Sequence, residues 1–226
     1  MLDLTSWSLA AKDALRSDET GMGYLTSRGI LGSVIEDYDI GFTKRFFPLN
    51  SDIDESSKWN QTFCSGKFPS VNKLIFPHYD DSGKKVISFS TRSISSKYYS
   101  HFIPEYASFK GALWGWKQAL PSIWKSRNVI ITEGIFDLLS LSHIRRDVVC
   151  TLTRTLTEGQ FRRILRYVDS VVLAFDMDDP GRKGCEIWCD KFIKEGKMAS
   201  ILEYKYKDLN EWWTKDPKNM ILSLRL

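Results

Sequence analysis

Four short runs of almost unbroken apolar residues stand out in the C-terminal half of the chain. They are NVIIT (128–132), DVVCTL (147–152), SVVLAF (170–175) and MASILEY (198–204). The segments between them, GIFDLLSLSHIRR, TEGQFRRILRYV and GRKGCEIWCDKFIKEG, carry apolar residues at helical spacing. Strands without alternation are buried on both faces, and strands that alternate with helices of this length form βαβ units. We therefore predict a parallel sheet flanked by helices over residues 128–226.

The pattern before residue 128 is different. Residues 1–45 have apolar positions three and four apart and are predicted to be mostly helical, whereas the polar, Ser-rich residues 50–70 are predicted to form an exposed loop. Two β-type runs within residues 71–94 flank Asp-Asp-Ser-Gly, which is a hairpin turn signal. Residues 1–127 are therefore expected to form a smaller, mixed α+β subdomain. The whole chain is predicted to be α/β (α+β overall), with domains 1–127 and 128–226.

Composition places the chain among globular proteins. It has 226 residues, of which 42% are hydrophobic, and this is ample for a core. No apolar run approaches the roughly 20 residues that cross a bilayer, and the first residues lack the features of a signal peptide. We therefore expect a cytoplasmic protein without a membrane partner.

Four cysteines bear on metal chemistry and on the redox compartment. Only Cys185 and Cys189 are close together, with C-x3-C spacing and no histidine nearby, so buried thiols are favoured over a zinc site. Free thiols fit a reducing compartment.

Positive charge is concentrated in the middle of the chain. The formal net charge is +4, but residues 66–127 carry 10 Lys and Arg against 3 Asp and Glu. A basic segment of this kind is typical of a protein that binds a polyanion, either nucleic acid or nucleotide phosphates. On charge alone, a solvated face rich in lysine is an equally good interpretation.

Carboxylates follow three of the predicted strands. Because ligands of parallel α/β sheets bind beyond the carboxyl ends of the strands, these acids are expected at one edge of the sheet. Their mutual repulsion favours a bound cation, and oxygen ligands suit Mg²⁺ or Mn²⁺ used in phosphate chemistry. The acids are Glu133 and Asp137 after the first strand, Asp176 and Asp178 after the third, and Asp208 and Glu211 after the fourth.

Simpler interpretations exist for each acid taken alone. Asp-Asp-Pro-Gly (178–181) is also an ordinary turn sequence, Asp137 could lie on the solvent side of its helix, and Glu211 could be a surface acid. A calcium loop of the EF-hand type starting at Asp176 fails, because its fifth and twelfth positions would be Pro180 and Ile187. The coincidence of acids at three strand ends is what favours a metal site.

At these residues the sequence resembles a known family. TEGIFD (132–137), FDMDDPGRKG (175–184) and KDLNEW (207–212) are similar to the E-G-x-x-D, D-x-D-x-x-G and K-D-x-[DN]-E motifs of the Toprim domain in DnaG-type bacterial and phage primases. YLTSRGI, IEDYDIGF, KLIFPHYDDSGKKVISFSTRSI, SKYYS and KGALWGWKQA resemble, in order, motifs of the polymerase core of that family. The resemblance covers about residues 20–215.

The resemblance implies a function and residue roles. It implies a DNA-directed RNA polymerase (nucleotidyltransferase) that makes short RNA primers on a single-stranded DNA template from nucleoside triphosphates. Glu133, Asp176 and Asp178 correspond to the catalytic acids, and Asp208 would join them in binding Mg²⁺ or Mn²⁺. The basic and aromatic positions that would face template and nucleotide phosphates are Lys73, Arg92, Lys97, Tyr98 and Lys110.

Some positions depart from the family pattern. Ser90 and Thr91 replace glycines that permit close backbone approach, and Tyr99 and Ser100 stand where the family has Asn-Ser. Arg154, in LTRTLT, is expected near the acidic edge, and Trp114 is expected either to stack on a base or to lie in the core.

The motifs also leave some family modules unaccounted for. No four-ligand Cys/His cluster for a zinc ribbon is present, so we expect a core, as in a phage or plasmid system, that works with a separate zinc-binding subunit and a replicative helicase. In a phage system the compartment would be the host cytoplasm. Two alternatives remain: a Toprim nuclease using the same acids, and a catalytically degenerate module that only binds single-stranded DNA or a replication partner.

Overall fold

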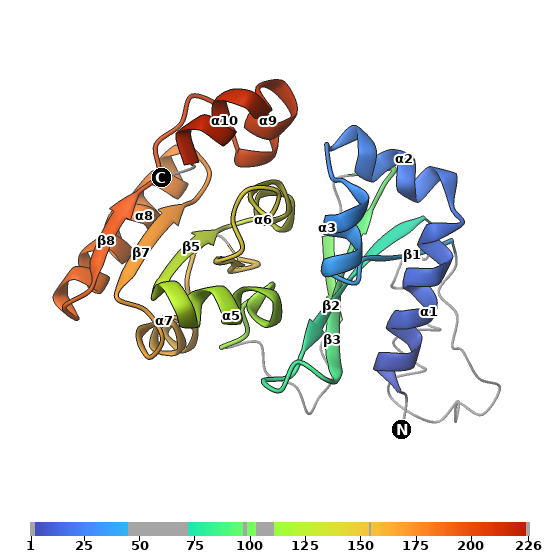
Figure 1. Ribbon diagram of the computed structural model, residues 1–226, viewed down its shortest axis with the longest axis horizontal. Helices are drawn as coiled ribbons and strands as arrows, with labels where there is room; N and C mark the ends of the chain where they lie inside the picture. The colour runs from blue at the N-terminus through green and yellow to red at the C-terminus, as the bar shows by residue number, and fades with distance from the viewer. Residues whose placement is uncertain (1–2, 45–71, 97–98, 103–110, 154, 225–226) are drawn as a thin grey trace. The chain divides into compact units, whose positions relative to one another are not determined.

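The computed structural model describes residues 3–44, 72–96, 99–102, 111–153 and 155–224 (Figure 1). The chain divides into two compact units. The first comprises Met1–Thr26 and Tyr38–Ala107, and the second comprises Ser27–Asp37 and Ser108–Leu226. These units are defined by packing, and the domain limits 1–127 and 128–226 stay a prediction. The predicted loop 50–70 lies outside the described residues.

The first unit is built on a four-stranded antiparallel sheet of order β1-β2-β3-β4. The predicted hairpin is confirmed as β2 (Lys73–Tyr79) and β3 (Val86–Ser93), joined by a turn in which Gly83 has φ of 69°. Two strands were not predicted, β1 (Gly41–Thr43) and β4 (Tyr99–Phe102), because three or four residues give too short a pattern.

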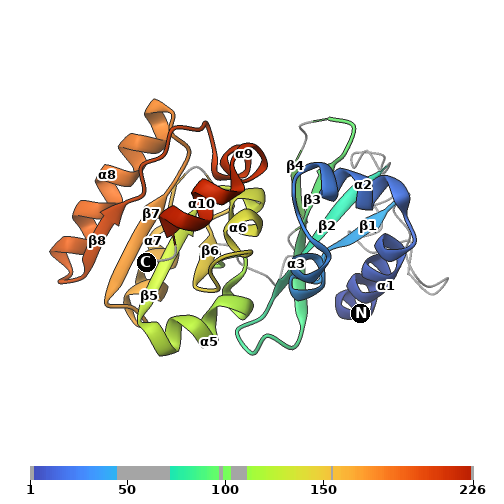
Figure 2. The same cartoon turned by 45° about the horizontal axis from the view of Figure 1, so that its top comes forward.

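Helix α1 (Leu4–Arg16) covers this sheet, and α2 (Glu19–Ser27) follows it (Figure 2). Asp3 caps α1 by accepting a hydrogen bond from the backbone N–H of Thr5. Trp7 stacks on Phe89 of β3, with 4.6 Å between ring centroids. Where α1 crosses β1, a side chain on Gly41 would lie 2.7 Å from the Ala11 Cβ, so only glycine permits this approach.

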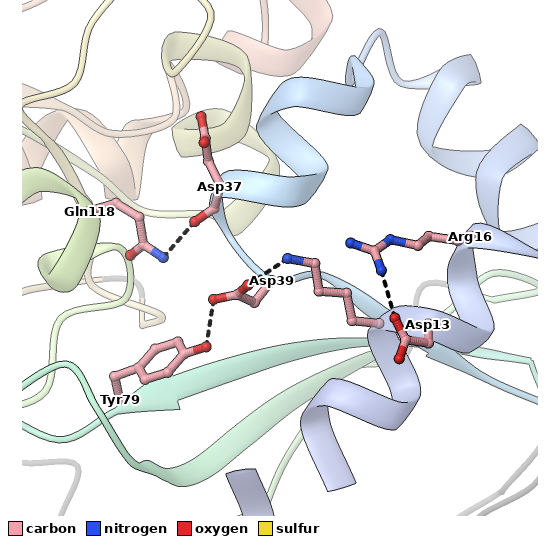
Figure 3. Close-up of polar contacts among 7 residues, drawn as sticks. Asp13, Arg16, Asp37, Asp39, Tyr79 and Gln118 are labelled. Atoms are coloured by element: carbon pink, nitrogen blue, oxygen red, sulfur yellow. Dashed lines mark hydrogen bonds and ion pairs between the residues drawn. The ribbon is translucent and has the colours of Figure 1, made fainter. Parts of the chain in front are cut away.

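Asp39 connects α1 to the sheet in the first unit. Its carboxylate accepts hydrogen bonds from Lys12 Nζ at 2.7 Å and from the Tyr79 hydroxyl at 2.6 Å (Figure 3). Burial and the Asp39 carboxylate together raise the pKa of Tyr79, so its hydroxyl stays a hydrogen-bond donor. Asp39 has a φ of 51°, a left-handed conformation that aspartate tolerates better than most residues.

The second unit contains a four-stranded, all-parallel sheet of order β6-β5-β7-β8. Its strands are β5 (Asn128–Thr132), β6 (Val148–Cys150), β7 (Ser170–Ala174) and β8 (Met198–Ile201). Its helices are α3 (Gly32–Asp37), α5 (Trp116–Ser126), α6 (Ile135–Leu141), α7 (Glu158–Leu165), α8 (Asp179–Lys194), α9 (Leu209–Lys215) and α10 (Pro217–Leu224). The predicted fold class is confirmed: the chain is α/β (α+β overall), with a parallel sheet flanked by helices that follows a smaller mixed α+β part in the sequence.

One core cluster of the second unit lies between the sheet and α5, α7 and α8, and includes Ile123, Ile131, Ile164, Leu173 and Phe192. The opposite side is occupied by α6, which packs on β5 and β6 and on α9. The apolar run of β8 predicted a strand buried on both faces. That prediction is wrong, because β8 is an edge strand and Met198 is 68% exposed.

Two further expectations concern the core and the cysteines. Trp114 belongs to the core, where it is buried and forms an isolated bridge with Cys150. Cys150 and Cys185 are buried free thiols, as expected, and Cys189 is half-buried. In the ranges that the structure describes, no helix has the length and apolar character needed to cross a membrane.

Candidate active site: acidic residues at the carboxyl ends of the parallel strands

The chain order around the sheet creates a switch point between β5 and β7. From β5 the chain passes through α6 to β6 on one side, and from β7 it passes through α8 to β8 on the other. β5 and β7 are hydrogen-bonded neighbours in parallel register, with Thr132 opposite Ala174. In sheets of this kind, ligands bind beyond the strand ends at the switch point. Glu133 follows β5 directly, and Asp176 follows β7 by two residues.

Asp178 caps the helix that follows β7. Its Oδ1 accepts a hydrogen bond of 2.8 Å from the backbone N–H of Gly181, which fixes the turn from strand to helix. A side chain on Gly181 would collide with the carbonyl oxygen of Asp176, so the turn requires glycine here. Asp179 and Pro180 are the first two residues of α8, so the Asp-Asp-Pro-Gly sequence leads from the strand into this helix. Asp178 itself is exposed at this edge.

Asp208 reaches the same edge from the segment after β8. Its Oδ1 accepts a 2.7 Å hydrogen bond from the backbone N–H of Glu211 and so caps α9. The backbone N–H of Met177 donates to the carbonyl of Lys207 at 3.1 Å, and the Tyr204 hydroxyl donates to the carbonyl of Phe175 at 2.9 Å. These two bonds hold the segment before α9 against the segment after β7.

Asp137 is buried and does not face solvent, so the simpler interpretation of this residue is wrong. Burial raises its pKa to about 8, and the nearby carboxylates of Asp176, Asp208 and Glu133 act in the same direction. Burial together with Asp208 and Asp178 raises the pKa of Asp176 to about 6. The acids from three strand ends therefore interact electrostatically, as predicted from the sequence.

A hydrogen-bond network centred on Asn210 connects the acid Asp137 to the surrounding helices. Its backbone N–H donates to Asp137 Oδ1 at 3.1 Å, and its side-chain Nδ2 donates to the Arg28 carbonyl and to Ser140 Oγ, both at 2.9 Å. Arg28 Nη1 in turn donates to Asn210 Oδ1 at 3.0 Å. The network joins α6, α9 and the segment before α3, so it fixes the helix that Asp208 caps.

Glu211 is partly a surface acid, as the simpler interpretation expected. Its carboxylate pairs with Lys215 Nζ at 2.7 Å and accepts a hydrogen bond from the backbone N–H of Lys207, and these partners lower its pKa. It therefore contributes to the capping turn of α9 and not to the group of mutually interacting acids.

The donor chemistry of this edge fits a divalent cation. Carboxylates from three strand ends gather here, and burial together with their mutual repulsion raises the pKa values of Asp137 and Asp176, although the nearby charge of Lys207 acts in the opposite direction on Asp176. A bound cation would favour the ionised carboxylates. As the side chains lie, no three Asp, Glu, His or Cys residues within the described part of the chain are arranged to hold a metal ion. Asp178 and Asp208 each use Oδ1 for a helix cap. A carboxylate has a second oxygen with lone pairs of its own, which can bind a cation.

The structure describes two of the five predicted nucleotide-binding residues, and both lie in the first unit. Lys73 begins β2, is buried, and has its pKa lowered by burial. Arg92 donates from Nε to the Tyr24 hydroxyl at 2.9 Å, and its guanidinium lies 4.6 Å from the centroid of the Tyr99 ring. Burial alone would lower the pKa of Arg92, but Tyr99 and Tyr24 outweigh it and raise the pKa. The other predicted residues, Lys97, Tyr98 and Lys110, and also Arg154, lie outside the described residues.

Known proteins are similar to this chain in sequence and in fold. Residues 130–213 match the Toprim-like family. The DNA primase of Halalkalibacterium halodurans is 30% identical over 205 residues, which are 81% of this chain and 34% of that protein. The chain is a relative of the DnaG-type primases. It spans about a third of the length of the curated primases it matches.

Solved primase structures have the same fold as this chain. The DnaG catalytic core aligns with a TM-score of 0.78 and 18% identity, covering 97% of this chain and 76% of that one. A DnaG primase catalytic domain bound to single-stranded DNA aligns with a TM-score of 0.77 and 17% identity, covering 97% and 77%. The predicted resemblance to a primase core with a Toprim domain is therefore confirmed.

Proposed function

We propose that this chain is a DNA primase core that synthesises short RNA primers on single-stranded DNA. The observation that carries the proposal is the convergence of Glu133, Asp176, Asp178 and Asp208 at the switch point of a Toprim-like sheet. The similarity to curated DNA primases supports the same activity. The enzyme class is a DNA-directed RNA polymerase, a nucleotidyltransferase.

Four acids would hold Mg²⁺ or Mn²⁺, with Asp176, Asp178 and Asp208 as the main ligands and Glu133 as organiser or proton acceptor. When bound, such ions supply electrostatic stabilisation of the triphosphate and of the leaving pyrophosphate, as in two-metal nucleotidyl transfer. Asp178 and Asp208 are pre-oriented by their caps, so they lose little freedom on binding. Glu133 immediately follows a buried strand and is half-buried, so its backbone position is fixed.

The basic residues would bind phosphates. Arg92 has its guanidinium held by Tyr24 and Tyr99, which leaves it fixed in orientation and fully charged. Lys73, Lys97, Tyr98 and Lys110 are assigned to the same role from the family resemblance, toward template and incoming nucleotide. A separate zinc-binding subunit and a replicative helicase are the expected partners, and the cytoplasm of a bacterium, or of a phage-infected host, is the expected compartment.

The test is an incubation of the chain with single-stranded DNA, four ribonucleoside triphosphates and Mg²⁺ or Mn²⁺, with and without a candidate zinc-binding subunit. Short RNA products that need both template and nucleotides support the proposal. Metal-dependent degradation of the DNA without nucleotides would instead identify a Toprim nuclease. DNA binding without either reaction, in all of these mixtures, would identify a binding module.

A further inference from the structure

Helices α5 and α7 of the second unit lie near each other (Figure 1). Aromatic and basic side chains from the two helices and their C-terminal ends contact one another. Tyr167, just after α7, packs edge-on against Trp116 with 5.2 Å between ring centroids and lies 6.2 Å from Trp124. The Arg163 guanidinium lies 4.7 Å from the centroid of the Trp116 ring. Core packing explains Trp116, which is buried, but it does not explain Trp124, which is 68% exposed.

The exposed face of α5 follows from its sequence. Four exposed residues share one side of the helix, because they lie at helical spacing from Lys117: Pro121 is four residues after it, Trp124 seven and Lys125 eight. The opposite side carries Ala119 and Ile123 into the core. Trp124 therefore lies on the solvent side, with its ring tilted at 57° to the Tyr167 ring.

The two helices beside this face are rich in cations. α5, α7 and their C-terminal caps carry six cations, namely Lys117, Lys125, Arg127, Arg162, Arg163 and Arg166. The nearby acids are already paired: Glu158 with Arg162 and Lys191, and Asp169 with Arg127 and Lys197.

Two of these cations have no such partner. Lys125 and Arg166 are exposed and make no ion pair with any residue that the structure describes. Both charges are therefore available to a polyanion.

We propose that Trp124, Tyr167, Lys125 and Arg166, called here the α5–α7 surface, bind single-stranded DNA outside the acidic site. The proposal deepens the proposed function, because it assigns a second contact to the template strand. An exposed indole offers a stacking platform for an unpaired base, and neighbouring cations neutralise the backbone phosphates. Single-stranded DNA is favoured over a duplex, because the bases of a duplex are already stacked on one another and leave no free face for Trp124.

The test is fluorescence anisotropy of a labelled oligothymidylate with the whole chain, over a range of salt concentrations. Trp124→Ala is expected to weaken binding about tenfold, the size of one lost base–aromatic stack. Met198→Ala removes an apolar side chain of equal exposure on β8 and is expected to bind as the unaltered chain does. Circular dichroism and thermal melting confirm that each variant is folded.

Two double variants, each of which removes two positive charges, complete the test. Lys125→Gln with Arg166→Gln should reduce the slope of log K against log salt by about 1.4, because each lost phosphate contact removes about 0.7 on single strands. Lys194→Gln with Lys218→Gln removes the same charge from α8 and α10 and should leave the slope nearly unchanged. Equal effects of the two pairs, unchanged binding by Trp124→Ala, or a stronger dependence on Trp124 for duplex DNA or anionic lipid vesicles would overturn the proposal.

RNA synthesis by the same preparations separates this inference from the proposed function. If the unaltered chain makes no RNA but binding depends on Trp124, the primase assignment fails and the α5–α7 surface stands. If the unaltered chain makes RNA but Trp124→Ala binds DNA as well as the unaltered chain does, the α5–α7 surface is wrong and the primase assignment stands.

Discussion

Replacing Asn210 by alanine should destabilise the second unit by about 3.5 kcal/mol. Asn210 is 3% exposed, and its side chain makes three hydrogen bonds, to the Arg28 carbonyl, to Ser140 Oγ and from the Arg28 guanidinium. A neutral buried bond contributes about 1 kcal/mol and one to a charged group about 1.5 kcal/mol, so the three bonds together contribute about 3.5 kcal/mol. The loss should also loosen α9, which Asp208 caps.

The measurement is urea unfolding of Asn210→Ala, with Asn219→Ala as the matched control. Asn219 is exposed, and its side chain accepts one hydrogen bond, from Trp212 Nε1 at 3.2 Å, so its loss should cost less than about 1 kcal/mol. If the two variants lose equal stability, the network around Asn210 does not hold the acidic edge together and the reasoning is refuted.

Three further outcomes are expected. Because burial raises the pKa of Asp137 from 3.8 to about 8, the folded chain binds a proton that the unfolded chain releases above about pH 4, so metal-free stability should fall as pH rises from 4 to 8. Asp137→Asn should remove that fall, which denaturation in EDTA at several pH values measures, and an unchanged pH profile would contradict it. Burial lowers the pKa of His78 from 6.5 to about 3, so as the pH drops the unfolded state binds a proton at His78 before the folded state does. The stability of the first unit should therefore fall below about pH 6.5, and the fall should be smaller in His78→Asn. Gly181→Ala should reduce the free energy of unfolding by more than about 2 kcal/mol, because the added Cβ would collide with the Asp176 carbonyl oxygen. Gly32→Ala is the control: its Cβ would lie in open space, so it should change the free energy of unfolding by less than about 0.5 kcal/mol. Equal melting temperatures of the two variants would contradict the tight turn at Gly181.

Periodicity in the sequence was enough to predict the parallel sheet, since four apolar runs between helical segments admit few other arrangements. The order of the strands is what the pattern left open, and that order explains the site, because β5 and β7 turn out to be neighbours whose connections leave in opposite directions. The exposure of β8 was missed because an apolar run does not reveal whether a strand lies at the centre or the edge of a sheet.

At the site, the acids themselves were predictable, but their support was not. Asn210 stands within the KDLNEW motif, yet its partner Arg28 lies 182 residues earlier, and nothing local in the sequence connects them. The burial of Asp137 was likewise open, because a carboxylate in the first turn of a helix is usually solvated. Trp124 gave no signal, since an exposed tryptophan on an amphipathic helix looks like a core residue until the helix is placed.

The central claim is that the acids after β5, β7 and β8 form one metal-dependent centre for primer synthesis. The most direct measurement compares the unaltered chain with Asp176→Ala and Asp178→Ala for RNA synthesis on single-stranded DNA in Mg²⁺ or Mn²⁺, with DNA binding measured on the same preparations. The account predicts short RNA from the unaltered chain and none from either variant, while all three bind single-stranded DNA alike. Full synthesis by either variant would contradict it.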